Sequence, residues 1–249
     1  MLINSKEMAV VQVGAFEGAT EFDPLYGTLH AHREALLKQP KNSWKLVLVE
    51  PVGEHFAKLR DNYSFLPGTR FENVAIAAQP GKATLYHLGV RPEDHGYPAW
   101  LAQLSSLKRE RLEEIWNRYE ANPEYQAFYL KHRVETTVEC LTMAQLLERH
   151  GIAAVSLLQI DAEGFEGEIL RSLPFQTIPF RFINYESVLL GDDKPACERL
   201  LHKHGYHMVH FGQDTLCYRP EDERLFPKWV RHAWRAHAQT LAAGGVTAS

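Results

Sequence analysis

The segment LLQIDAEGFEGEIL, residues 157–170, changes from apolar to acidic near its midpoint. The mostly apolar run from 154 to 160 predicts a strand buried on both faces. Asp161 therefore follows the end of an inner strand, which is where open α/β sheets place their ligands. A carboxylate at such a position can serve as a general base, so Asp161 is the first candidate for that role.

A helix is predicted directly after this strand, over residues 163–173, from the spacing of its apolar residues. Glu163 and Glu166 fall in its first turn, where the helix dipole favours negative charge. Glu163 could orient a substrate or could only stabilise the helix, and the sequence leaves both readings open. Glu186, in the segment INYES, ends the predicted strand 181–187 and is the second candidate base.

A glycine turn follows the first predicted strand, residues 8–13, in the segment VQVGAFEGAT. Its glycines let the backbone pass close to a ligand, and the amides that open the next helix could bind polar or anionic groups. The spacing is GxxxG and not GxGxxG, so a plain structural turn is the alternative. The candidate cofactor contacts in this turn are Gln12, Gly14, Ala15, Phe16, Gly18 and Thr20.

Two further segments end at the same predicted edge of the sheet. In LVLVEP, Glu50 and Pro51 follow the strand 44–49, and an acid there could accept hydrogen bonds from both hydroxyls of a ribose or could cap the next helix. In FENVAIAA, three residues could flank an adenine ring or could belong to ordinary strand packing: Asn73, Val74 and Ala75. The convergence of these loops favours an adenosine cofactor without pyrophosphate, and the missing fingerprint disfavours a nicotinamide dehydrogenase.

The order of elements predicts an α/β fold with a doubly wound, mainly parallel, seven-stranded sheet and a reversed terminal strand. The predicted strands are 8–13, 44–49, 70–77, 155–161, 181–187, 206–211 and 215–219, with residues 81–88 as a further edge strand. This shape is typical of class I methyltransferases, which are Rossmann-like.

We expect a single domain over residues 1–249 with two additions. A helical insertion at about 89–133 is a candidate lid beside the ligand edge, and His87 and His95 near it are candidate substrate contacts. A helical tail at about 222–249 would pack on the domain or on a second copy of the chain, as in a homodimer.

The composition narrows the classes of function. The chain has 249 residues, is 45% hydrophobic and 23% charged, and carries a net charge of -4, which gives no electrostatic footprint for nucleic acid. No apolar run reaches the roughly 20 residues that a membrane span needs. Three widely spaced cysteines without a zinc pattern fit a reducing compartment, so we expect a soluble cytoplasmic protein.

Five segments, VQVGAFEGAT, LVLVEP, ENVAIAA, LLQIDAEGFEGEIL and INYES, occur in an order that resembles the FkbM family of S-adenosylmethionine-dependent methyltransferases. IDAEGFE carries most of the resemblance, which covers about residues 9–219. The chain departs from the family pattern at Gln12, where such proteins often have Asp, and at Phe16-Glu17, where an Asn-containing turn is common. The resemblance implies S-adenosylmethionine as cofactor and O-methylation of a hydroxyl on a sugar, glycolipid or secondary metabolite.

Three alternatives stay open at this stage. The departures from the family pattern are compatible with a module that binds the cofactor without catalysis. A nucleic-acid methyltransferase is disfavoured by the acidic balance and by Asp-Ala-Glu-Gly where an (Asp/Asn)-Pro-Pro-(Tyr/Phe) motif would stand. No metal motif is present, although Asp161 and Glu186 could hold Mg²⁺ to acidify an acceptor hydroxyl.

Overall fold

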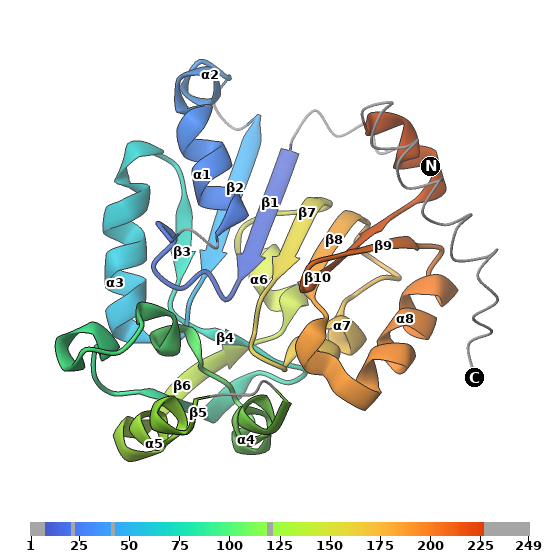
Figure 1. The fold of residues 1–249 in the computed structure, drawn as a ribbon. Coiled ribbons are helices and arrows are strands. Elements are labelled where there is room, and N and C mark those ends of the chain that lie inside the picture. The colour runs from blue at the N-terminus through green and yellow to red at the C-terminus, as the bar shows by residue number, and fades with distance from the viewer. Residues whose placement is uncertain (1–7, 21–22, 41–42, 119–121, 227–249) are drawn as a thin grey trace.

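The computed structural model describes residues 8–20, 23–40, 43–118 and 122–226, and its central feature is a seven-stranded sheet (Figure 1). In spatial order its strands are β3 (Arg70–Glu72), β2 (Trp44–Val49), β1 (Met8–Val13), β7 (Val155–Ile160), β8 (Phe180–Glu186), β10 (Asp214–Tyr218) and β9 (His207–Phe211). The first five are parallel to one another, whereas β10 is antiparallel to both β8 and β9. The predicted, mainly parallel sheet with a reversed terminal strand is confirmed.

Helices cover both faces of this sheet. The helices are α1 (Pro24–Ala31), α2 (Arg33–Leu37) and α3 (Gly53–Asn62), and further along the chain α6 (Met143–Arg149), α7 (Glu166–Ser172) and α8 (Lys194–Lys203). Alternate residues of β2 divide between two cores: Leu46 and Leu48 share a buried cluster with Leu59 of α3, while Val47 and Val49 belong to the cluster that includes α6, α7 and α8. Both faces of the inner strands are therefore apolar, which explains why these strands read as continuous hydrophobic runs.

A second, three-stranded sheet carries the insertion. Its strands are β4 (Ala75–Ile76), β6 (Arg133–Leu141) and β5 (Gly81–Leu88), in that spatial order. Between β5 and β6 the chain forms 3₁₀ helices at Pro92–His95 and Ala99–Gln103, then α4 (Arg109–Arg118) and α5 (Pro123–His132). The predicted insertion is thus helical within its described residues, and Figure 1 shows it beyond the carboxyl ends of β1 and β2.

Two sequence predictions about strands were incomplete. The predicted strand 70–77 is divided, because β3 pairs with β2 whereas β4 pairs with β6 of the second sheet. Asn73 lies at the break, where its side-chain amide donates to the backbone carbonyls of Glu50 and Pro51, at 2.8 and 3.1 Å. Strand β6 was not predicted at all, and it is the partner of the predicted edge strand 81–88.

The helix predicted over 163–173 begins later, at Glu166. Glu163 has a positive φ of 49° and lies in the turn before the helix, so the expectation that it stands in the first helical turn was wrong. Its place in the turn follows from Glu166, whose Oε1 accepts hydrogen bonds from the amides of Ala162 and Gly164, at 2.7 and 3.3 Å. The buried Glu166 side chain therefore closes the loop that follows Asp161.

Among the described residues, no helix combines the length and the apolar character that a membrane crossing requires. The predicted helical tail falls mainly outside the described residues, because these end at 226 after a 3₁₀ helix at Pro220–Leu225.

Candidate active site

The glycine turn after β1 is built against the loop after β7. The amides of Gly14 and Ala15 both donate to the carbonyl of Val49 at 3.0 Å, and the amide of Asp161 donates to Val13 at 2.9 Å. Gly14 has a φ of 76°, and a Cβ on it would lie 1.6 Å from the carbonyl oxygen of Asp161. The turn therefore requires glycine at this position. It brings the loop after β1 into direct contact with the loop after β7.

The side chain of Glu50, which follows β2, holds the same turn in place by hydrogen bonds to backbone amides. Its Oε2 accepts from the amide of Phe16 and its Oε1 from the amide of Val52, both at 2.8 Å. Each carboxylate oxygen retains a second acceptor position, so these bonds leave capacity for the two hydroxyls of a ribose. Burial raises the pKa of Glu50 to about 7, against the lowering effect of the two amides.

The pH dependence of stability should report on Glu50. Its folded-state pKa is raised from 4.5 to about 7, so its contribution to stability is present below pH 4.5 and is lost as the pH rises through 7. Glu50→Gln removes this titration, and we expect the loss in unfolding free energy between pH 5 and pH 8 to be about 1 to 3 kcal/mol smaller than in the wild type. Urea unfolding at both pH values measures the difference. Equal pH dependence in the two proteins would contradict the assignment.

Most of the predicted cofactor residues line two adjoining pockets at the carboxyl ends of the strands. One pocket is lined by Gln12, Gly14, Ala15, Phe16, Thr20, Asp23, Glu50, Gln103, Ser105, Gln159, Asp161 and Glu163. The other is more apolar, and its wall includes Pro51, Val74, Ala75, Leu85, Leu107 and Phe165. Four residues belong to both: Gly14, Glu50, Ser105 and Asp161. The loops of three separate strands therefore meet, as the sequence predicted, and the insertion adds Gln103 and Ser105.

Asp161 and the acids beside it all have raised pKa values. Asp161 lines the pocket and is accessible to solvent. Even so, desolvation of its carboxyl group by the surrounding protein, and then repulsion from Asp214 and Asp23, raise its pKa to about 7. Burial and then Asp161 raise the pKa of Glu186 to about 9. Burial and the neighbouring Glu186 also raise the pKa of Glu163 well above its ordinary value. The site thus holds carboxyl groups with graded affinities for a proton.

A row of buried amide side chains crosses the sheet beneath this pocket. Gln12 of β1 is paired in register with Gln159 of β7, which is paired with Asn184 of β8. Asn184 donates through Nδ2 to Gln159 at 2.9 Å and to Asp214 at 2.8 Å, and Gln12 donates to Asp23 at 3.1 Å. Sequence reasoning missed Gln159, Asn184, Asp23 and Asp214 in this role.

Five candidate residues lie outside the walls of these two pockets, and one of them, Glu186, lies beside Asp161. Gly18 packs against Tyr63, whose ring would lie 2.6 Å from a Cβ at that position. Asn73 holds the end of β2, as described above. The His87 ring lies between the carbonyl of Leu88 and the hydroxyl of Thr136, at 2.8 and 2.9 Å.

His95 belongs to the insertion, where its ring packs against those of Phe128 and His132, with centroids 5.6 and 5.2 Å apart. Its contacts, like those of His87, are the ones expected of structural histidines, and roles of either in substrate binding stay predictions.

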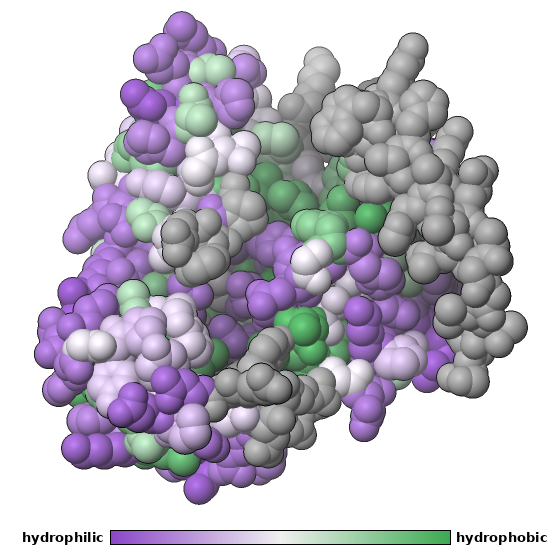
Figure 2. All heavy atoms as spheres, viewed as in Figure 1, coloured by the Kyte–Doolittle hydropathy of each residue, from purple (hydrophilic) through white to green (hydrophobic). Residues whose placement is uncertain are grey.

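A larger cavity of about 450 Å³ adjoins the pocket of the glycine turn, and Phe16, Thr20 and Gln103 line both. Its remaining wall combines the first turns of α3 with the insertion, including His55, Lys58, Arg91 and Trp100. Figure 2 shows that hydrophilic residues predominate on this side of the molecule and that it is hollowed near its centre. The insertion therefore forms one wall of a polar recess next to the predicted cofactor site.

Fold and pocket together define a class I methyltransferase: a sheet with a reversed β10, a glycine turn after β1, and acids after β2 and β7. The family model described as the methyltransferase FkbM domain matches residues 13–208, and the chain belongs to this family. Membership implies S-adenosylmethionine as the methyl donor.

Two solved structures are similar to the chain at low identity. One is a ribosomal protein L11 methylase from Lactobacillus delbrueckii subsp. bulgaricus, with 8% identity, a TM-score of 0.35, and coverage of 86% of this chain and 70% of that one. The other is the delta-N METTL16 MTase domain, with 11% identity, a TM-score of 0.34, and coverage of 85% and 73%. A comparison with curated proteins gives no match.

The residues present fit this cofactor. Gly14 lets the turn after β1 close onto the Asp161 backbone at the edge of both pockets, Glu50 offers acceptor positions for a ribose, and Val74 and Phe165 supply apolar surface for a purine. The carboxyl groups around Asp161 suit the positive charges of the sulfonium and of the methionine ammonium group.

Proposed function

We propose that this methyltransferase transfers the methyl group of S-adenosylmethionine to a hydroxyl group of a sugar, glycolipid or secondary metabolite. The observation that carries the proposal is the position of Asp161, which lines both pockets of the predicted cofactor site and adjoins Glu163 and the amide of Gln159. A carboxyl group there is placed to receive a proton beside the transferred methyl group.

The reaction needs one proton acceptor and aligned reactants. Bound S-adenosylmethionine supplies an electrophilic methyl group. Asp161 would take the proton of the acceptor hydroxyl as the methyl group passes from sulfur to that oxygen, and the demethylated cofactor would be the second product. Gly14 and Glu50 fix the position of the donor, and the insertion limits the access of water through Gln103 and Ser105.

Asp161 is a better base than Glu186 at neutral pH. With a pKa of about 7, Asp161 is partly ionised under these conditions and still has a useful affinity for a proton. Burial and the neighbouring Asp161 raise the pKa of Glu186 further, to about 9, and Glu186 lines neither of the two pockets. Glu163 lines the same pocket, and we propose that it orients the acceptor.

The lining of the recess supports a polar acceptor. Carboxyl and amide groups gather at Asp161, Gln159 and Asp23. Trp100, which is 37% exposed, contributes an aromatic surface to the adjoining cavity. Side-chain amides and carboxylates are hydrogen-bond partners for the hydroxyl groups of a sugar, and an aromatic ring can pack against its apolar face.

The surroundings of the enzyme are also part of the proposal. Cys140, Cys197 and Cys217 are all buried and unpaired, which fits the reducing conditions of the cytoplasm. A homodimer formed through the tail is a further proposal, although the tail lies outside the described residues.

Calorimetry with S-adenosylmethionine and with its demethylated product tests cofactor binding, and transfer of a labelled methyl group tests catalysis. We expect both ligands to bind with micromolar affinity and label to enter hydroxyl-bearing sugars or natural products. Binding without transfer to any acceptor would favour the non-catalytic alternative. Label that enters only RNA or protein would contradict the proposed acceptor class.

Mg²⁺ held by Asp161 and Glu186 is a second means of making the acceptor hydroxyl more acidic. The proposed reaction does not depend on it, because Asp161 can accept the proton without an ion.

A further inference from the structure

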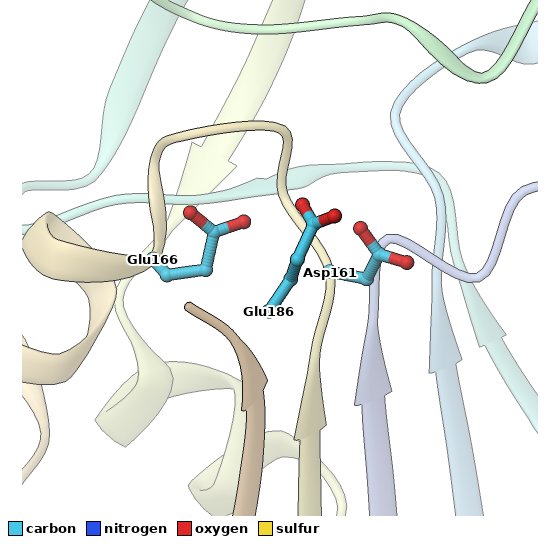
Figure 3. A group of neighbouring side chains, drawn as sticks. All are labelled: Asp161, Glu166 and Glu186. Atoms are coloured by element: carbon cyan, nitrogen blue, oxygen red, sulfur yellow. The ribbon is translucent and has the colours of Figure 1, made fainter. Parts of the chain in front are cut away.

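Three carboxyl groups from different elements meet beside the predicted cofactor pocket. Asp161 follows β7, Glu166 is the first residue of α7, and Glu186 is the last residue of β8. One oxygen of each lies within 4.8 Å of an oxygen of each of the others. Figure 3 shows the carboxyl group of Glu186 between those of Asp161 and Glu166.

Glu166 gives an independent sign that a ligand is needed here. The residue is 0% exposed, and its Oε1 accepts from the amides of Ala162 and Gly164. Its Oε2 is buried and has no hydrogen-bond partner within the described ranges, and the same holds for Oε2 of Glu186. Leaving a buried carboxylate oxygen unpartnered costs free energy, so these two oxygens call for a positively charged or hydrogen-donating group.

The basic side chains near α7 form ion pairs with two other acids. Lys108 contacts Glu168, and Arg171 pairs with Glu168 at 3.5 Å and with Asp193 at 2.9 Å. These cations therefore balance the outer side of α7. Within the described residues the three inner carboxyl groups form no ion pair with a basic side chain, so their charge is left for a ligand to balance.

We propose that Asp161, Glu166 and Glu186 form a binding site for a hard divalent cation such as Mg²⁺, Mn²⁺ or Ca²⁺. Carboxylate oxygens are the protein ligands that these ions prefer. Two oxygens bound to one Ca²⁺ at about 2.4 Å are at most about 4.8 Å apart. The three carboxylate oxygens here all lie within that limit of one another. Water or an acceptor oxygen completes the coordination, since the described residues supply three groups.

Glu166 then has two tasks. Through Oε1 it fixes the loop after Asp161, and through Oε2 it binds the ion, so the turn and the cation stabilise each other. That the ion also binds the acceptor hydroxyl and lowers its pKa rests on the proposed methyl transfer. The binding of the ion does not.

Mn²⁺ binding to the purified full-length protein tests the site. We expect electron paramagnetic resonance and calorimetry to show one Mn²⁺ per chain, displaced by Mg²⁺ or Ca²⁺. Glu186→Gln should weaken Mn²⁺ binding at least about 10-fold, because a charged ligand is lost without any hydrogen bond that the structure records for that side chain. The control is Glu139→Gln, which removes a surface carboxylate paired with Lys82 and should leave Mn²⁺ binding unchanged.

Glu166→Gln gives a second measurement, since a glutamine oxygen still accepts the two loop amides. Unfolding temperatures show whether each variant folds. The proposal is overturned if the folded wild-type protein binds no Mn²⁺, Mg²⁺ or Ca²⁺ at about 10 mM, or if both folded variants bind Mn²⁺ as the wild type does. Mn²⁺ binding is measured without cofactor or acceptor, so failure of methyl transfer does not affect this result.

Discussion

Gly14→Ala is expected to lower the affinity for S-adenosylmethionine at least about 100-fold and the unfolding temperature by about 5 °C or more. The new Cβ would lie 1.6 Å from the carbonyl oxygen of Asp161, and alanine would have to adopt a φ of 76°. The backbone conformation alone costs about 1 to 3 kcal/mol. Relieving the clash moves the turn away from Asp161 and disturbs the amide that Phe16 donates to Glu50. Calorimetry with the cofactor and a thermal unfolding scan measure both effects.

Gly96→Ala is the matched control. Gly96 has a φ of 79°, almost the same as Gly14, but among the described residues no heavy atom beyond its own chain neighbours lies within 4 Å of the Cβ position. This variant bears the backbone cost without the clash, and its cofactor affinity should stay within about threefold of the wild type. Equal affinity in the Gly14 and Gly96 variants would mean that the close approach of the turn to Asp161 has no part in cofactor binding.

The sheet was predictable from the sequence because its inner strands are buried on both faces. Such strands appear as short apolar runs, and each site loop follows one of them: Gly14 after β1, Glu50 after β2 and Asp161 after β7. The parallel arrangement then places these loops at one edge. Most of the candidate cofactor residues could therefore be brought together without knowing any side-chain contact.

The second sheet was harder to predict for a physical reason. Strand β6 is mostly exposed along its length, so Arg133–Leu141 alternates polar and charged residues with few apolar ones and has no continuous hydrophobic run. The break after Glu72 depends on hydrogen bonds from Asn73 to a loop more than 20 residues earlier in the chain. Periodicity reports burial along a segment, and it does not show which of two sheets a strand joins.

Local patterns also misplaced Glu163, whereas Glu166 does stand in the first turn of α7. Glu163 was assigned to a helical turn because helix dipoles favour acids, but Glu166 instead bends back to bind the loop amides. The amide row left a usable signal: Gln12 stands two residues before Gly14, and Gln159 stands two residues before Asp161. A glutamine at the same distance from the ends of two buried strands predicts a polar contact between those strands.

Asp161→Asn should reduce kcat by about 10²- to 10⁴-fold while the affinity for the demethylated cofactor stays within a few fold. Asparagine keeps the size of the side chain and cannot take the hydroxyl proton. The backbone of residue 161, which donates to Val13 and packs against Gly14, is unaffected. The control is Asp94→Asn, a change at an exposed residue of the insertion that should leave kcat unaltered.

The same variant separates the base from the cation. Asp161→Asn removes the proposed base and one ligand of the ion, whereas Glu186→Gln removes a ligand only. If the ion also binds the acceptor hydroxyl, excess Mn²⁺ should restore the turnover that the Glu186 variant has lost and little of that of the Asp161 variant. If Asp161→Asn turns over at the wild-type rate with the cofactor bound, Asp161 is not the base, and Glu186 becomes the candidate to test.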